Sequence, residues 1–170
     1  VGLHPLTIIV AVMVGTTLLG GIIGGILAIP LTAALRVLMF RYVWKETYQA
    51  LQSVRADETD QFDGALLRYI NPVAGGFTLP TMSCEIQLLK PGKETQAHRH
   101  TSTALYHVFR GRGRTRVGEG YLEWEKGDSF VIPLWQWHSH ESDGREEAVL
   151  FSINDRPIME SLELYREEAR

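Results

Sequence analysis

Three histidines in the second half of the chain have the spacing of a metal site. His98 and His100 lie two residues apart, so on a β-strand both side chains project from the same face. His138 follows a Gly-Asp turn and an apolar stretch that ends at Pro133, which can return its ring to the same interior. Three neutral imidazoles that converge on one point can bind a metal and leave coordination positions open. We therefore predict that His98, His100 and His138 are metal ligands.

Three further histidines need a separate interpretation. His140 lies two residues after His138 and shares its face on a strand, so it is the main alternative for the third ligand. His107 alternates with Tyr106 and Val108 on the strand after the first pair, where it either supports the pocket or is a plain barrel residue. His4 lies far away in an apolar segment, and we assign it no role.

The residues around the histidines have the pattern of short strands. Apolar and polar residues alternate in SCEIQLL, ALYHVF, YLEWE, SFVI and AVLFSI, and Gly or Pro separates these runs. Evenly spaced strands without a long helical stretch predict an all-β jelly-roll barrel. Residues 66–170 are enough for one such core. The last residues, MESLELYREEAR, are predicted to form a closing helix with Leu162 and Tyr165 on one face.

The order of the conspicuous residues resembles the cupin family. Its first motif runs from a glycine over five residues to His-x-His and on to a second glycine, and its second motif runs from glycine over five residues to proline and then to histidine. The positions that agree are Gly92, His98, His100, Gly111, Gly127, Pro133 and His138. Many cupins add a glutamate ligand, but Ala104 stands at that position. The expected site therefore has three histidines and no carboxylate from there.

A closer resemblance covers nearly all of residues 66–170. NPVAGGFTLPTM at 71–82, EIQLLKPGKETQAHRH at 85–100 and DRP at 155–157 resemble the gentisate 1,2-dioxygenase family and its salicylate and hydroxynaphthoate relatives. Members of that family are bicupins, and these motifs are similar to the second, carboxy-terminal cupin. The first cupin is missing from this chain.

The resemblance implies an oxidoreductase of aromatic catabolism. It implies Fe(II) as cofactor, and dioxygen and a gentisate-like aromatic hydroxy acid as partners. The ring would open between the carbons that carry the carboxylate and the hydroxyl group. An active domain, or a remnant of one, is the first interpretation. A non-catalytic cupin, tethered to a membrane and used for ligand sensing or assembly, is the alternative.

Seven residues near the ligands are candidates for substrate binding. Arg99 is a candidate partner of a substrate carboxylate, as are Arg110, Arg112 and Arg114, although strand alternation turns some of these to solvent. Trp135 and Gln136 flank His138, where they either line the pocket mouth or pack the barrel. His107 completes the set.

The first 45 residues have a different composition. Residues 1–35 contain no Asp, Glu, Lys or Arg, and residues 6–29 are long and apolar enough for a bilayer span. A signal peptide fits poorly, because no basic region precedes the apolar run. Arg36, Arg41 and Lys45 follow it and predict a cytoplasmic location for the next domain. We therefore expect a transmembrane helical segment at 1–45, a linker at 46–65 and the cupin at 66–170.

The apolar segment also carries a resemblance. HPLTIIVAVMVGTTLLGGIIGGILAIPLTAALRVL at 4–38 resembles the carboxy-terminal end of the AI-2E family of bacterial permeases. This stretch corresponds only to the last membrane elements of that family, so no transport function follows. The sequence also begins with Val1 and not with Met. Together with this partial resemblance, we expect a fragment, a fusion or a sequence join.

The composition of the chain argues against several other classes of function. Cys84 is the only cysteine, which excludes a disulfide framework and a thiolate zinc site within this sequence. A net charge of −3 without a basic stripe argues against a nucleic-acid partner. Loss of a partner cupin would expose apolar surface, so we expect a homo-oligomer.

Overall fold

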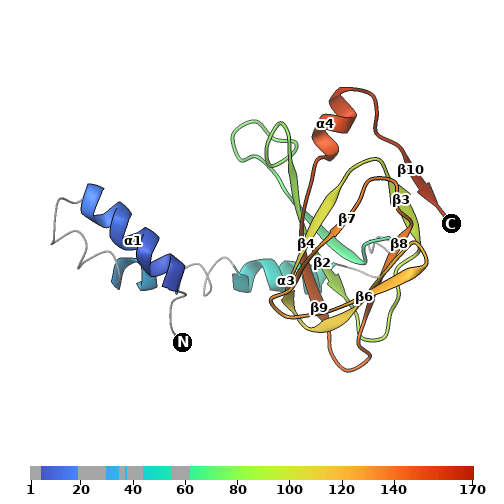
Figure 1. Ribbon diagram of the computed structural model, residues 1–170, viewed down its shortest axis with the longest axis horizontal. Helices are drawn as coiled ribbons and strands as arrows, with labels where there is room; N and C mark the ends of the chain where they lie inside the picture. Colours follow the sequence, from blue (N-terminus) through green and yellow to red (C-terminus); the bar gives the residue numbers. More distant parts are fainter. Residues whose placement is uncertain (1–4, 19–29, 35–36, 38–43, 55–61) are drawn as a thin grey trace. The chain divides into compact units, whose positions relative to one another are not determined.

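The computed structural model describes residues 5–18, 30–34, 37, 44–54 and 62–170, and its contacts divide the chain into two units, Val1–Ala50 and Leu51–Arg170. In the first unit α1 spans Pro5–Leu18 and residues 30–34 are also helical (Figure 1). The helix α3, Lys45–Ser53, begins in the first unit and ends in the second. The limits 1–45, 46–65 and 66–170 stay a prediction.

The predicted membrane span is not supported. Among the ranges that the structure describes, no helix has both the length and the apolar content needed to cross a membrane. The helix α1 has 14 residues, and residues 19–29 of the predicted span lie outside the described residues. The same gap interrupts the stretch at 4–38 that resembles a permease, and that resemblance is not shown.

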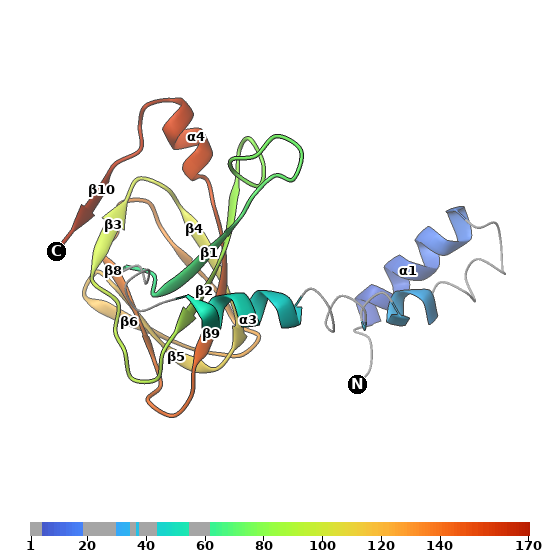
Figure 2. The same ribbon diagram turned by 180° about the vertical axis from the view of Figure 1, so that it is seen from behind.

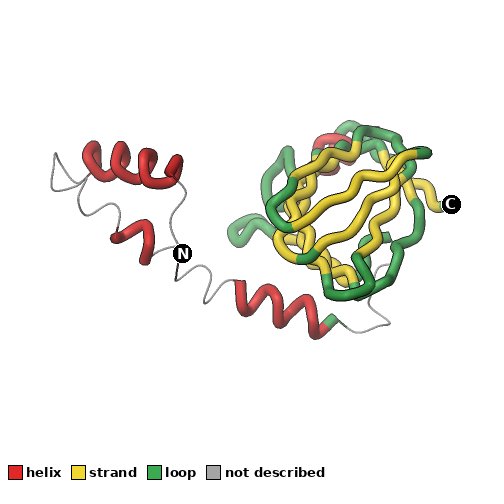
Figure 3. The backbone as a smooth tube through the Cα atoms, turned by 60° about the horizontal axis from the view of Figure 1, so that its bottom comes forward, coloured by secondary structure: helices red, strands yellow, loops and turns green. Residues whose placement is uncertain are grey.

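The second unit is built from two five-stranded antiparallel sheets. The first contains β1 Ala65–Tyr69, β2 Ser83–Leu89, β9 Ala148–Asn154, β4 Ala104–Arg110 and β7 Ser129–Ile132, in that order. The second contains β10 Glu167–Ala169, β3 His98–His100, β8 His138–Ser142, β5 Arg112–Val117 and β6 Gly120–Glu125. The strands face one another around a common interior (Figure 3), so the predicted all-β jelly-roll architecture is confirmed.

Alternation along the strands separates the interior from the outer surface. On β4, Ala104, Tyr106 and Val108 are buried, whereas Leu105 and His107 are exposed. The same period of two places one face of each strand in a shared core. The core cluster consists of Leu89, Ala104, Tyr106, Val108, Trp124, Ile132, Ala148 and Leu150. Burial of these side chains fixes which residues of β3 and β8 point inward.

The carboxy-terminal helix predicted for residues 159–170 is wrong for most of its length. Helix α4 spans only Arg156–Ser161, and Glu163 adopts a positive φ of 59°. A residue whose backbone lies in this left-handed region interrupts a right-handed α-helix. The chain then continues as β10, which pairs antiparallel with β3 and lies beside it in both views (Figures 1 and 2). The last residues therefore form an edge strand next to His98 and His100.

Candidate metal centre

The three predicted ligands meet inside the second unit. His98 and His100 lie on β3, and His98 is the register partner of His138 on β8. The ring centroid of His138 lies 4.2 Å from that of His98 and 5.0 Å from that of His100. One ligand atom from each of the three rings can be chosen so that all lie within 4.8 Å of one another. All three side chains are buried, so the cluster can hold one ion away from bulk water.

Main-chain carbonyl groups orient each of these rings through Nδ1. His138 Nδ1 lies 2.9 Å from the carbonyl oxygen of Gln136, and His100 Nδ1 lies 2.8 Å from that of Ser102. His98 Nδ1 lies 3.3 Å from the carbonyl oxygen of Gln96. A carbonyl oxygen only accepts, so Nδ1 carries the proton and Nε2 carries the lone pair that a metal needs. Within the described residues, Nε2 of His138 and Nε2 of His140 are both buried without a hydrogen-bond partner, and only His138 belongs to the cluster of three candidate ligands.

Burial keeps the rings of His138 and His100 neutral at neutral pH. Loss of hydration, together with the nearby His98, lowers the pKa of His138 to about 3. Burial also lowers the pKa of His100, partly opposed by its hydrogen bond to the Ser102 carbonyl group. A neutral imidazole is the form that binds a metal. The donor set therefore fits a metal ion without a competing proton.

His140, the alternative third ligand, does not join the cluster. Its ring is fully buried, and its Nδ1 lies 2.8 Å from Thr115 Oγ1. The indole N–H of Trp124 donates to the same hydroxyl oxygen at 2.8 Å. Burial lowers the pKa of His140 well below its ordinary value. His140 is thus a neutral side chain of the core, placed beside the cluster by β8.

A cavity of about 290 Å³ lies next to the cluster. Apolar, polar and charged residues all contribute to its wall. Its lining consists of Phe62, Asp63, Leu66, Arg68, Glu85, His98, His100, Ser102, Ala104, Tyr106, Asn154, Arg156, Tyr165 and Glu167. Strands from both sheets and the start of α4 contribute to it.

None of the seven residues predicted to bind substrate lines this cavity. His107 is exposed on the outer face, with Nδ1 2.9 Å from Ser129 Oγ. The guanidinium carbon of Arg99 lies 4.4 Å from the ring centroid of Trp135 and 4.7 Å from that of Trp137, and Arg99 pairs with Glu168. Alternation explains this, because Arg99 points away from the face that His98 and His100 share.

Trp135 and Gln136 contribute through the main chain instead. The backbone N–H of Trp135 donates to the carbonyl oxygen of His100 at 2.9 Å. The carbonyl oxygen of Gln136 accepts from His138 Nδ1. These two residues therefore help to position His100 and His138, although their side chains do not line the cavity.

The structure brings in polar residues that the sequence analysis missed. Arg68 Nε donates to Glu85 Oε1 at 2.8 Å, and Asn154 Nδ2 donates to Glu85 Oε2 at 3.3 Å. Glu85 lies on β2, a strand whose residues are mostly buried, and its side chain lines the cavity. A charged residue at an inward position of such a strand was the available signal.

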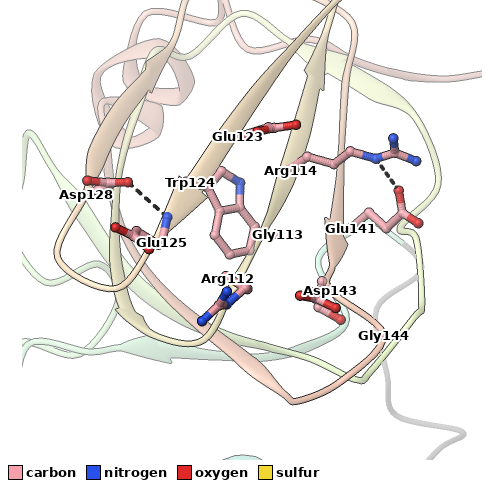
Figure 4. A pocket seen from close by; sticks show the side chains of 11 residues that line it. Arg112, Gly113, Arg114, Glu123, Trp124, Glu125, Asp128, Glu141, Asp143 and Gly144 are labelled. Atoms are coloured by element: carbon pink, nitrogen blue, oxygen red, sulfur yellow. Dashed lines mark hydrogen bonds and ion pairs between the residues drawn. The ribbon is translucent and has the colours of Figure 1, made fainter.

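A larger hollow of about 610 Å³ lies elsewhere and shares no residue with the histidine cavity. Figure 4 shows that charged side chains of β5, β6 and β8 surround it. Arg114 pairs with Glu141 at 2.6 Å, and Asp128 accepts from the backbone N–H of Glu125. Because it lies away from the buried histidines, we assign the metal chemistry to the smaller cavity.

Comparison with known proteins agrees with this geometry. Residues 85–154 match the family model of the cupin domain. A 5-aminosalicylate 1,2-dioxygenase of Comamonas sp is 44% identical over 133 residues, which cover 77% of this chain and 35% of that protein. A gentisate 1,2-dioxygenase of Haloferax sp is 43% identical over 130 residues, with 75% and 35% covered.

Solved structures give the same result. The crystal structure of a salicylate 1,2-dioxygenase from Pseudoaminobacter salicylatoxidans with gentisate superposes with a TM-score of 0.69 at 33% identity, covering 76% of this chain and 36% of that one. The chain thus spans about a third of the length of the curated relatives that it matches. The match to the cupin family model lies within residues 85–154 and does not reach the segment at 4–38.

Proposed function

Because this chain contains a cupin domain related to gentisate and salicylate dioxygenases, we propose that the domain binds Fe(II) and serves dioxygen-dependent cleavage of an aromatic hydroxy acid. The observation that carries the proposal is the common orientation of His98, His100 and His138. Each has Nδ1 against a main-chain carbonyl oxygen, which leaves Nε2 for a metal.

The residues of the chain would act by position and charge. His98, His100 and His138 would hold the ion on one side, which leaves positions for a ligand with adjacent carboxylate and hydroxyl groups. A ferrous ion bound there supplies the redox chemistry with dioxygen. Position 104 is an alanine and supplies no carboxylate ligand. Three neutral histidine ligands would therefore leave the ion its full positive charge, which suits an anionic chelating substrate.

The cavity suits a small aromatic acid. Its volume of about 290 Å³ lies at the lower end of ligand pockets, which range over about 300–1,000 Å³. Phe62, Leu66 and Ala104 offer apolar contact to a ring, whereas Arg68 and Arg156 offer positive charge. We propose gentisate or a similar hydroxybenzoate as the substrate class.

The test uses the full chain loaded with Fe(II) in the absence of dioxygen. Gentisate and dioxygen are then added, and both oxygen consumption and absorbance of the ring-opened product are followed. We expect both signals in the parent chain and neither in His100→Ala. A chain that binds one ferrous ion but neither binds nor consumes gentisate would contradict the proposal.

A second candidate is a non-catalytic cupin that uses the cavity to bind a ligand. In that case the cupin binds the aromatic acid without turning it over. Tight binding of gentisate with no oxygen consumption would identify this function. Membrane attachment and a homo-oligomeric state stay predictions.

A further inference from the structure

Two arginines at the histidine cavity are held in the same way. Arg68 donates from Nε to Glu85 at 2.8 Å, and its guanidinium carbon lies 5.6 Å from the ring centroid of Phe77. Arg156 donates from Nε to Glu160 at 2.6 Å, and its guanidinium carbon lies 4.3 Å from the ring centroid of Tyr165. Each guanidinium is therefore fixed by a carboxylate at one edge and an aromatic ring near its face.

A hydrogen-bonded chain connects the two arginines. Glu85 accepts from Arg68 and from Asn154, and Ser83 Oγ donates to the same carboxylate at 3.2 Å. The side-chain oxygen of Asn154 in turn accepts from the backbone N–H of Arg156 at 3.2 Å. The strands β1, β2 and β9 are neighbours in the sheet, so this chain runs across them to the start of α4. Rigid strands thus set the position of both basic groups.

The terminal nitrogens of both arginines remain available. Within the described residues, neither guanidinium makes a hydrogen bond through Nη. Their side chains are 38% and 30% exposed, which places them where a ligand from solvent can reach them. The acids of the cavity already have partners, since Glu85 accepts three hydrogen bonds and Glu167 accepts one from Tyr165 at 3.0 Å. The groups that remain for a ligand are therefore the positively charged Nη donors of Arg68 and Arg156.

We infer that Arg68 and Arg156 bind the carboxylate of the aromatic acid and so determine specificity at this site. The inference rests on the proposed function, because it places the ligand in the cavity beside His98 and His100. Planar guanidinium groups match a carboxylate through paired N–H donors. Their fixation lowers the entropy that binding costs. This role belongs to neither Arg99 nor Arg114, which are paired outside the cavity.

The test compares two small ligands on the same metal site. Salicylate and catechol both offer two adjacent oxygens to a metal, but only salicylate carries a carboxylate. Calorimetry measures the binding of each to the ferrous-loaded full chain without dioxygen, so no turnover occurs. Arg68→Gln and Arg156→Gln are expected to weaken salicylate binding by about tenfold to a hundredfold each and to leave catechol unchanged. Arg114→Gln is the matched control, and it should bind both ligands like the parent chain.

Folding is controlled separately. Arg68→Gln leaves Glu85 without its charged partner, so a second variant combines it with Glu85→Gln and removes both charges together. Thermal melting identifies which of the two remains folded, and the folded variant should show the same selective loss of salicylate binding.

The outcomes separate this inference from the proposed function. Salicylate affinities within about twofold of the parent value in both arginine variants would overturn the inference alone. Failure of the metal-loaded parent chain to bind salicylate or gentisate would overturn both. Inorganic phosphate that binds the parent as tightly as salicylate, with the same arginine dependence, would show a general anion site and overturn the carboxylate specificity.

Discussion

His98 and His138 are direct partners across β3 and β8, and their ring centroids lie 4.2 Å apart. This bridge is the only register pair between these two strands, and the backbone N–H of Trp135 adds a hydrogen bond to the carbonyl oxygen of His100. The third ligand, His100, follows on the same face of β3. The metal centre therefore depends on the alignment of two short strands as much as on the ligands themselves.

Single replacements of the ligands should abolish metal binding. We expect the full chain to bind about one ferrous ion and His98→Ala, His100→Ala or His138→Ala to lose most of it, because two imidazoles leave too few donors. Metal analysis after desalting measures this. His107→Ala is the control, since His107 lies on the outer face. Stoichiometric metal in folded His98→Ala would reject the ligand assignment.

His140→Ala should still bind the metal, although the loss of a buried side chain should lower the thermal stability of the domain. His140 contacts Thr115 through Nδ1 and is not part of the ligand cluster. The same metal analysis, with a thermal melt to show folding, separates the two effects. Loss of metal from a folded variant would restore His140 as a candidate ligand.

Thr115 should stabilise the fold through its hydroxyl group. Its Oγ1 accepts from the indole N–H of Trp124 and contacts His140 Nδ1, both at 2.8 Å. Thr115→Val would leave two buried polar atoms without partners, at roughly 1–3 kcal/mol each. We expect a lower free energy of unfolding in urea, whereas Thr115→Ser, which keeps the hydroxyl, should lose less. Equal losses in the two variants would argue that the methyl group matters instead.

The metal-free chain should lose stability as the pH falls below about 6.5, the ordinary histidine pKa. Burial lowers the pKa of His138 to about 3, so between these values the unfolded state binds more protons than the folded state. The free energy of unfolding therefore rises with pH across this window, with a limiting slope of about 1.4 kcal/mol per pH unit for such a group. Above the window the stabilisation from the neutral buried ring has reached its full value.

Urea unfolding at several pH values between 5 and 7.5 tests this dependence. His138→Gln should flatten the slope, and His107→Gln should not, because that side chain is exposed. The lowered pKa values of His100 and His140 act with the same sign. An unfolding free energy that is constant over this range would contradict the assignment of neutral buried rings.

Gly113 should tolerate no side chain. An added Cβ would overlap the carbonyl oxygen of Glu141 and lie 2.5 Å from the ring of Trp124, so the strand or the indole must move. We expect Gly113→Ala to destabilise the domain by about 1–3 kcal/mol. Gly120→Ala is the matched control on the neighbouring strand, where the nearest atom is 3.8 Å away. Similar thermal midpoints for the two variants would show that the close contact relaxes easily.

Local patterns predicted much of the molecule. The two-residue period identified the strands and the shared face of His98 and His100, and the glycine and proline spacing indicated the return of His138. The same period turned Arg99 outward, which a closer use of alternation would have predicted. The two-residue period predicts which residues share a face of a strand. It is therefore enough to place two side chains together when both lie on the same strand, as His98 and His100 do.

Contacts between distant strands were decided by the tertiary structure. The sequence left His138 and His140 as alternatives, because both have the inward parity; only the pairing of His98 with His138 distinguishes them. Residues 159–170 were expected to be helical, yet pairing with β3 and the positive φ of Glu163 make the end a strand. Arg68, Glu85 and Arg156 lie in separate elements, and only the sheet order brings them to one cavity. Register between strands depends on packing of the whole core, which no local segment of the sequence encodes.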